Sequence, residues 1–307
     1  MIISCDWGTS SFRLRLVDNP SAGSAPPNIR SSLHRPTGIA ATFSDWQRSR
    51  LPAEARVGFF QAVLQAAIGE LGTDLHGIPV VISGMASSSI GMMELPYHPL
   101  PFLISGEDLL PAVVPATPAF PHVLLLVPGI RSIDDVMRGE ETQLIGCGVS
   151  SGLFLFPGTH SKHVVVQDGR AVAFSTFMTG EFFGLLSRQS ILAASVAEGE
   201  PADEAFLAGV DAARGSGILH SAFSVRTNQL FGRFSKTDNY QYLSGLVIGE
   251  ELKGLAPQRV SLVAAGPLRQ AYAAALQRLG FREVAHIDAD TALVEGHRRI
   301  FGGYKNP

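Results

Sequence analysis

Residues 6–19 read DWGTSSFRLRLVDN, and residues 156–169, at an offset of 150, read FPGTHSKHVVVQDG. Each copy follows a short apolar run and continues into an alternating or β-branched stretch that ends at a turn. This order indicates a strand, a tight Gly-Thr turn and a second strand in each copy. We therefore interpret the two segments as an internal duplication. Four of the 14 aligned positions are identical: Gly8/Gly158, Thr9/Thr159, Ser11/Ser161 and Asp18/Asp168.

Patterns typical of strands and helices interleave along the chain, which predicts the α/β class. The alternation over residues 12–16 predicts a half-buried strand with Arg13 and Arg15 pointing outward, and residues 19–28 predict a loop. The length of 307 residues suits two domains, and we place them at 1–149 and 150–307. Strands are expected at 79–82, 122–127, 162–167, 171–175 and 259–264, and helices at 53–71, 140–149, 181–195, 203–214, 240–254, 267–280 and 289–301.

Composition excludes several classes of partner. The chain has 24 basic and 27 acidic residues, so it lacks the basic surplus of a protein that binds nucleic acid. Its apolar runs are far shorter than the roughly 20 residues of a membrane span. Cys5 and Cys147 form neither a disulfide framework nor a zinc pattern, and the N-terminus does not look like a signal peptide. We expect a cytoplasmic protein, and a homo-oligomeric state is compatible with the sequence.

The two Gly-Thr turns suit phosphate binding. Glycine lets the backbone approach an anion closely, and neighbouring N–H groups and hydroxyls can donate to phosphate oxygens. Structural hairpins with no ligand remain the alternative reading of each turn alone. Together the turns suggest two loops that face one polyphosphate from opposite domains, and Lys162, the one lysine among the first 235 residues, adds a point charge. The candidate residues are Gly8, Thr9, Ser10, Ser11, Gly158, Thr159, His160, Ser161 and Lys162.

Asp6 ends the first apolar strand immediately before the first turn. A carboxylate at this point would repel a phosphate unless a cation lay between them. An Mg²⁺ ion held by one carboxylate and by phosphate oxygens would resolve the conflict. The alternative is an aspartate that caps the tight turn.

The acidic run at residues 134–141 enters a helix. Its carboxylates either stabilise the helix N-terminus or supply a general base for a substrate hydroxyl. Glu140 and Glu141 lie about 100° apart on a helix, so only one of them can face a given cleft. Arg138 could hold a substrate carboxylate, and Arg131 is a second candidate for that role.

The remaining motifs give weaker indications of function. The sequence contains no P-loop lysine motif. Residues 148–152 match G-x-S-x-G, but a helix precedes them and a strand follows, which is the reverse of a hydrolase elbow. Residues 260–267 combine a strand, a small-residue turn and a helix start, which leaves room for a flat ring or ribose or else serves tight packing.

These residues resemble the motifs of a known superfamily. Residues 6–10 resemble the first phosphate motif of the sugar kinases, actin and heat-shock chaperones, residues 157–162 resemble the second, and residues 264–266 occupy the place of the adenosine motif. The adenosine resemblance adds Ala265 and Gly266 to the nucleotide candidates. A closer resemblance, to the 2-dehydro-3-deoxygalactonokinase family, rests on residues 83–85 with 96–97, 137–146, 157–162, 178–181 and 242–246.

The resemblance implies two ribonuclease-H-like domains with a cleft between them, and transfer of the γ-phosphoryl group of ATP to the 6-hydroxyl of 2-dehydro-3-deoxy-galactonate. It implies Mg²⁺ as cofactor and a catalytic carboxylate at Glu140 or Glu141. It also implies substrate contacts at 87–89 (Ser87, Ser88 and Ser89), where this chain departs from the Gly-Ser-Asn type of the family. The alternatives are a kinase for another small sugar acid or amino sugar, and a non-catalytic actin-like ATP-binding protein.

Overall fold

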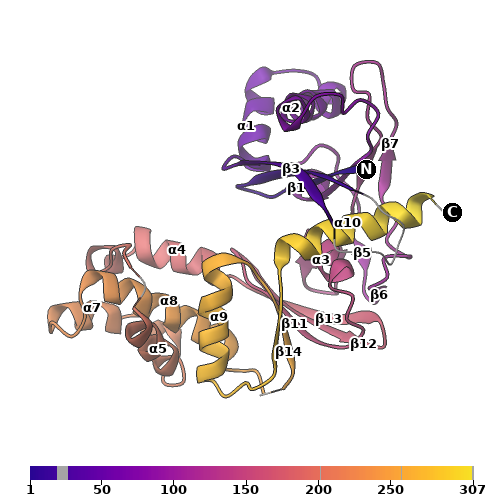
Figure 1. Ribbon diagram of the computed structural model, residues 1–307. Helices are drawn as coiled ribbons and strands as arrows, with labels where there is room; N and C mark the ends of the chain where they lie inside the picture. Colours follow the sequence, from indigo (N-terminus) through magenta and orange to yellow (C-terminus); the bar gives the residue numbers. More distant parts are fainter. Residues whose placement is uncertain (19–26, 201, 257, 306–307) are drawn as a thin grey trace. The chain divides into compact units, whose positions relative to one another are not determined.

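The computed structural model describes residues 1–18, 27–200, 202–256 and 258–305 (Figure 1). These residues form two compact units. Unit 1 contains Met1–Ser151, Val165–Phe174 and Asp288–Pro307, and unit 2 contains Gly152–Val164 and Ser175–Ile287. The units are therefore discontinuous in sequence. Most of the loop expected at residues 19–28 lies outside the described residues.

Unit 1 is built on a mixed sheet. The first three strands form an antiparallel meander, and β4 and β8 continue the sheet in parallel with β1. The register pairs Trp7 with Phe12 across the first hairpin and Asp6 with Ser83 of β4. In spatial order the strands are β3 (Ile29–Arg35), β2 (Phe12–Val17), β1 (Ile2–Trp7), β4 (Val80–Gly84), β8 (Leu124–Leu126) and β7 (Ala112–Val114).

The helices α1 (Ile39–Ser49) and α2 (Arg56–Leu71) cover one face of this sheet (Figure 1). Trp7 lies at the centre of the resulting core, and its ring packs edge-on against Phe12, with 5.0 Å between centroids. The next two helices, α3 (Glu140–Cys147) and α10 (Ala289–Lys305), cross where glycines allow close approach. A Cβ placed on Gly146 would lie 1.7 Å from the Ala292 carbonyl oxygen.

The expectation that both arginines of β2 point outward was wrong for Arg15. Its side chain is 8% exposed and its guanidinium donates to Asp290 Oδ1 at 2.5 Å. Alternation predicted an outward face, but α10 covers that face and supplies the carboxylate. Arg13, by contrast, is 41% exposed, as the pattern predicted.

A second, small sheet of unit 1 has three short strands, two of which lie between β8 and α3 in the chain. Its strands are β10 (Val136–Met137), β9 (Ile130–Arg131) and β5 (His98–Pro99). They position residues 136–139, which lead directly into α3.

The sheet of unit 2 repeats the strand order of unit 1. Its order is β13 (Arg170–Phe177), β12 (Ser161–Gln167), β11 (Gly152–Phe156), β14 (Val260–Val263) and β15 (Val284–Ile287), which matches β3-β2-β1-β4-β8. β11 is parallel to β14, as β1 is to β4. The residues 165–174 that group with unit 1 bring β13 against β6 (Phe102–Leu103). The shared strand order supports the duplication that the sequence indicated.

The helices of unit 2 were only partly expected. The helices predicted near 181–195, 203–214, 240–254 and 267–280 are present, whereas the short α6 and α7 and the strand β15 were not singled out. Their bounds are α4 (Thr179–Gln189), α5 (Asp203–Ala212), α6 (Ile218–Ser221), α7 (Ser224–Leu230), α8 (Lys236–Leu252) and α9 (Gly266–Arg278).

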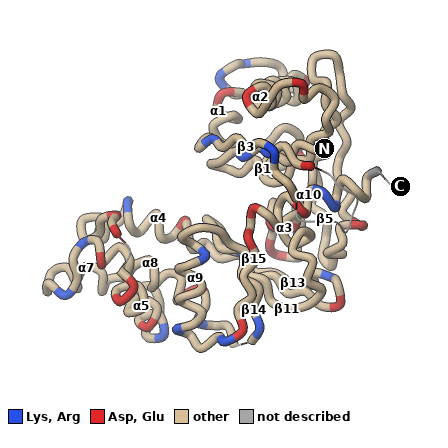
Figure 2. The backbone as a smooth tube through the Cα atoms, in the orientation of Figure 1, with Lys and Arg blue, Asp and Glu red and all other residues tan. Residues whose placement is uncertain are grey.

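Charged residues of both signs are interspersed along both units, and the central strands β11 and β14 carry none (Figure 2). Within the described residues, no helix is long and apolar enough to cross a membrane.

Candidate active site

The first Gly-Thr hairpin joins β1 to β2. The N–H of Gly8 donates to the Ser11 carbonyl at 2.9 Å and closes the turn. The side chains of Thr9 and Ser10 are exposed. The start of α1 holds the turn from behind, because the N–H groups of residues 39 and 40 donate to the carbonyls of residues 8 and 9. The hairpin therefore presents its hydroxyls on a fixed backbone.

The contact behind this hairpin requires a glycine. A Cβ placed on Gly38 would lie 2.3 Å from the Gly8 carbonyl oxygen and 2.6 Å from the Ser11 nitrogen. No side chain can be accommodated at such distances without moving the backbone.

The second hairpin joins β11 to β12 and has the same support. The N–H of residue 181 donates to the Thr159 carbonyl at 3.1 Å, and a Cβ placed on Gly180 would lie 2.6 Å from the Gly158 carbonyl oxygen. Thr159 and His160 are exposed, and His160 Nε2 lies 2.5 Å from Glu181 Oε2. The sequence analysis missed this shared support, although a Thr-Gly pair recurs at 37–38 and 179–180.

Two of the candidates in the second hairpin are buried. Ser161 is fully buried and its hydroxyl contacts Tyr272 Oη at 2.9 Å, so it faces the core rather than solvent. Lys162 is 5% exposed. At the third nucleotide motif, Gly266 is exposed, and a Cβ placed on it would meet no atom within 4 Å among the described residues. Ala265 is half-buried at the N-cap of α9. Gly266 is therefore not held in a tight contact.

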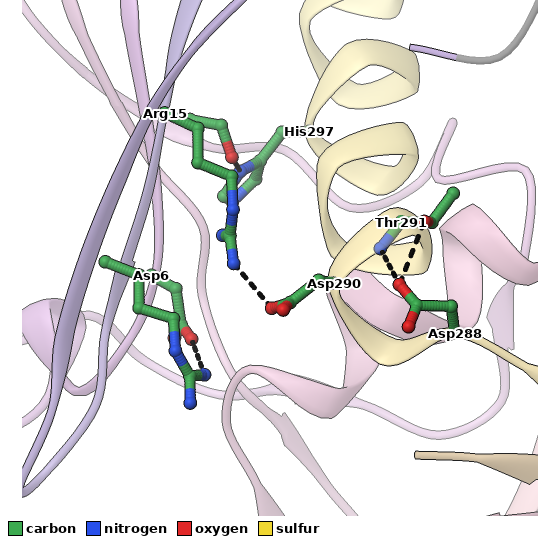
Figure 3. Close-up of polar contacts among 8 residues, drawn as sticks. Asp6, Arg15, Asp288, Asp290, Thr291 and His297 are labelled. Carbon is green, nitrogen blue, oxygen red and sulfur yellow. Dashed lines mark hydrogen bonds and ion pairs between the residues drawn. The ribbon is translucent and has the colours of Figure 1, made fainter. Parts of the chain in front are cut away.

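Asp6 lies in a cluster of alternating charges at the end of β1 (Figure 3). Its Oδ2 accepts from Arg13 Nη1 at 3.2 Å, and the Arg15–Asp290 pair lies close enough to influence it. Burial raises the pKa of Asp6, while the guanidinium groups of Arg13 and Arg15 oppose that shift. Arg13 is a cation beside Asp6 that the sequence analysis did not anticipate.

The arrangement at Asp6 fits a divalent cation. Mg²⁺ keeps several waters and needs only one or two protein carboxylates together with substrate phosphates. Asp6 is one such carboxylate, 18% exposed, and its bond to Arg13 is a single contact to a side chain that is 41% exposed. Within the described ranges no group of three or more metal-ligating side chains occurs, so a metal here would depend on substrate oxygens.

The start of α3 lies beside Asp6 in unit 1. A Cβ placed on Gly84 would lie 3.5 Å from Asp6 Oδ1, and one placed on Gly139 would lie 3.7 Å from the Gly84 Cα. Both glycines have positive φ, +88° and +113°, which side chains rarely adopt. These glycines bring the two glutamates of α3 to the end of β1.

The two glutamates have different environments. Glu141 is fully buried, and its carboxyl oxygens contact the Gly139 N–H at 2.6 Å and the Thr142 hydroxyl at 3.1 Å. Burial, followed by repulsion from Glu140, raises the pKa of Glu141 to about 8. Glu140 is half-buried, and its Oε2 accepts from the Arg138 N–H at 3.1 Å. The structure thus separates two neighbours that the sequence could not distinguish.

Arg138 connects the start of α3 to the loop after β4. Its Nη1 donates to the Ser87 carbonyl at 2.7 Å and to the Ser87 hydroxyl at 2.5 Å, and its guanidinium lies 4.3 Å from the centre of the Tyr97 ring. The buried Arg138 Nε has no hydrogen-bond partner among the described residues.

The remaining substrate candidates differ in accessibility. The Ser87 hydroxyl donates to the Val127 carbonyl and the Ser88 hydroxyl to the Met85 carbonyl, each at 2.7 Å, so both hydroxyls already have backbone partners. Ser89 is exposed. Arg131 is exposed on β9 and lines a separate cavity of about 490 Å³.

Comparison with known proteins supplies the family. The model of the 2-keto-3-deoxy-galactonokinase family matches residues 6–300. The chain belongs to this family. It is 34% identical over 309 aligned residues to the probable 2-dehydro-3-deoxygalactonokinase DgoK1 of Rhizobium meliloti (strain 1021), covering 95% of this chain and 93% of that one. It is also 34% identical over 251 residues to the 2-dehydro-3-deoxygalactonokinase of Escherichia coli (strain K12), covering 76% and 83%.

One solved structure agrees with this membership, and a second shares the fold. A crystal structure of a Sinorhizobium meliloti protein of the same family superposes with a TM-score of 0.81 and 30% identity, covering 99% of this chain and 96% of that one. The activator of the 2-hydroxyisocaproyl-CoA dehydratase from Clostridium difficile, solved with bound ADPNP, gives a TM-score of 0.50 at 12% identity, covering 99% and 95%. The α/β fold is thus that of the actin-like ATPases and sugar kinases, which confirms the fold and family resemblance drawn from the sequence.

Proposed function

We propose that this chain transfers the γ-phosphoryl group of ATP to the 6-hydroxyl of 2-dehydro-3-deoxy-galactonate. Membership of a family named for that kinase activity, over residues 6–300, is the observation that carries the proposal. Use of ATP as the phosphoryl donor favours a cytoplasmic location.

The two hairpins would bind the phosphates. Thr9 and Ser10 in unit 1, and Thr159 and His160 in unit 2, are exposed on turns whose backbones are fixed from behind. Fixed N–H and hydroxyl donors stabilise the charge that develops on the transferred group without reorganising during the reaction. The turn at Ala265 and Gly266, which is open at Gly266, would accept the adenosine.

Asp6 would hold Mg²⁺ together with phosphate oxygens. When bound, the ion would neutralise charge on the β- and γ-phosphates. Arg13 would then release Asp6 and bind a phosphate oxygen instead, because its partly exposed guanidinium makes only a single contact with the Asp6 carboxylate.

Glu140 would be the general base. A base must be ionised and must reach the proton that it accepts. Glu141 is fully buried and its raised pKa keeps it protonated at neutral pH, whereas Glu140 is half-buried at the same helix start. The Glu140 carboxylate would accept the proton of the 6-hydroxyl. At the same time the oxygen of that hydroxyl would form a bond to the γ-phosphorus, and ADP would leave.

Arg138 would orient the sugar acid. Its guanidinium is held by Ser87 and by the Tyr97 ring, so its remaining N–H groups have a fixed direction. Such a group suits a substrate carboxylate. Ser89, as the exposed serine of the loop, is the best placed of residues 87–89 to contact the sugar hydroxyls.

The test follows the product and compares two variants. The wild type should form ADP and a phosphomonoester at C6, detected by phosphorus NMR, only when the sugar acid is present. Glu140→Gln should lower kcat by about 10²–10⁴-fold, the usual contribution of a general base. Glu141→Gln, the matched control one residue away, should lower kcat by less than tenfold.

Two results would contradict the proposal. A larger kcat loss in Glu141→Gln than in Glu140→Gln would make Glu141 the base. ADP formation by the wild type that does not depend on the sugar acid would reject the kinase reaction itself and favour a nucleotide-hydrolysing protein.

A further inference from the structure

Glu251 is a buried carboxylate that the proposed reaction does not use. It is the penultimate residue of α8, and its side chain is 2% exposed. A negative charge at a helix C-terminus is disfavoured by the helix dipole, and burial adds a desolvation penalty. A carboxylate at this position needs several hydrogen-bond donors to be tolerated.

Three elements of unit 2 supply those donors. His163 Nε2, from β12, lies 2.8 Å from Glu251 Oε1. Tyr272 Oη, from α9, donates to Oε2 at 2.5 Å, and the Thr179 hydroxyl, from the first residue of α4, donates to the same oxygen. One carboxylate therefore ties together β12, α4 and α9.

The direction of the hydrogen bonds follows from Glu251. Burial beside this carboxylate raises the pKa of Tyr272, so its hydroxyl stays neutral and its proton is directed at Glu251. Ser161 must then donate its own proton to Tyr272 Oη, at 2.9 Å. The Ser161 oxygen is left as an acceptor, and it receives the Gly158 N–H at 3.3 Å. Hydrogen bonds in such a chain polarise and strengthen one another.

The hydrogen-bond network around Glu251 reaches the second hairpin from two sides. Through Tyr272 and Ser161 it fixes the N–H of Gly158. Through Thr179 it fixes the start of α4, whose next residue, Gly180, packs against the Gly158 carbonyl. The turn is thus held at both its N–H and its C=O by groups that depend on Glu251.

We propose that Glu251 is a positioning residue for phosphoryl transfer, which sets the backbone of the 158–161 turn through Tyr272, Ser161 and Thr179. This inference rests on the proposed function in taking the turn as a phosphate site. In this proposal Glu251 acts through the turn rather than by contact with a substrate. Its contribution is to hold the exposed donors of the turn, Thr159 and His160, in place for the nucleotide.

The experiment removes one hydroxyl at a time and measures binding of ATP with Mg²⁺ by equilibrium titration. Tyr272→Phe disconnects Ser161 from Glu251 and should weaken ATP binding by about fivefold to tenfold. KM for ATP should rise similarly, while KM for the sugar acid should stay within twofold of the wild type. Such a split is not expected from a general loss of stability.

Tyr242→Phe is the matched control. Tyr242 is also buried in unit 2, and its hydroxyl contacts Ser224 Oγ at 2.8 Å, which is a comparable bond away from the turn. It should lower the melting temperature about as much as Tyr272→Phe but leave ATP binding unchanged. Thr179→Val should reproduce the defect of Tyr272→Phe, and Thr179→Ser, which restores the hydroxyl, should recover most of the ATP affinity.

ATP binding by Tyr272→Phe as tight as that by Tyr242→Phe would overturn the inference, as would equal rises in both KM values. The binding titration does not require the sugar acid. A wild type that binds ATP without phosphorylating the sugar acid would therefore reject the proposed function, while the comparison of Tyr272→Phe with Tyr242→Phe would still decide the inference.

Discussion

The hairpin at residues 8–11 is closed by a backbone bond, Gly8 N–H to the Ser11 carbonyl, whereas the hairpin at 158–161 is closed by a side chain, the Ser161 hydroxyl. Behind the first turn lies an aromatic core around Trp7. Behind the second lies the polar chain that ends at Glu251. In both units, however, a glycine at the start of a helix touches the turn.

This difference shows which part of the duplicated unit is constrained. The contact of the helix with the turn is the same in both units, because it consists of backbone atoms and leaves no room for a Cβ. The side chains that support each turn differ, because apolar packing and a saturated hydrogen-bond network can fix a backbone equally well. Different side chains can therefore support the two turns, while a close backbone contact with a helix start is found in both units.

The largest effect should come from breaking the shared contact. Gly38→Ala and Gly180→Ala each place a Cβ within 2.6 Å of a turn carbonyl oxygen, so the turn must move. We expect each variant to lose at least 100-fold in kcat/KM, measured with ATP and the sugar acid.

Gly58→Ala is the control for the two glycine variants. Gly58 lies on the exposed face of α2, and a Cβ there would meet no described atom within 4 Å. Alanine at such a helical position should stabilise the fold by about 0.5–1 kcal/mol and leave activity unchanged. If Gly38→Ala or Gly180→Ala were as active as Gly58→Ala, the close contact would not be a functional constraint.

The next effect concerns the buried glutamates, which also differ between the units. Glu251 has three side-chain partners, whereas Glu141 of unit 1 contacts one N–H and one hydroxyl. Glu141 has a pKa of about 8 in the folded chain, against a usual value of 4.5. Between these pH values the folded chain keeps a proton that the unfolded chain has released, so stability falls as pH rises.

Glu141→Gln should remove this dependence. The variant should gain stability relative to the wild type as pH rises from about 4.5 to about 8, by more than about 1 kcal/mol, because one pKa unit corresponds to about 1.4 kcal/mol. Urea denaturation at pH 5 and pH 8.5 measures this difference. Parallel pH profiles for the two proteins would show that Glu141 is already ionised in the folded chain.

Much of this fold could be predicted from the sequence. The echo between residues 6–19 and 156–169 located both hairpins, because a Gly-Thr turn between two strands is a local pattern. The α/β class and most helices followed from periodicity. The family resemblance supplied the activity, since the blocks that carry it are spread over nearly the whole chain.

The supports of the turns could not be predicted, because they depend on contacts between distant residues. Arg15 looked like an outward-facing residue, and its partner Asp290 is 275 positions away. Glu251 is one of two adjacent glutamates in α8, and nothing in the spacing indicates that it meets Tyr272 and Ser161. The repeated Thr-Gly pair at 37–38 and 179–180 was a detectable signal that we did not use.

The central claim is that both hairpins bind the phosphates of ATP, and removing one exposed hydroxyl from each tests it most directly. Thr9→Ala and Thr159→Ala should each weaken ATP binding by at least about fivefold in equilibrium titration with Mg²⁺, because hydrogen bonds to charged groups contribute about 1.5–3 kcal/mol. Thr73→Ala, at an exposed threonine outside both hairpins, should leave binding unchanged. An ATP affinity equal to that of the wild type in either Thr9→Ala or Thr159→Ala would contradict the claim for that hairpin.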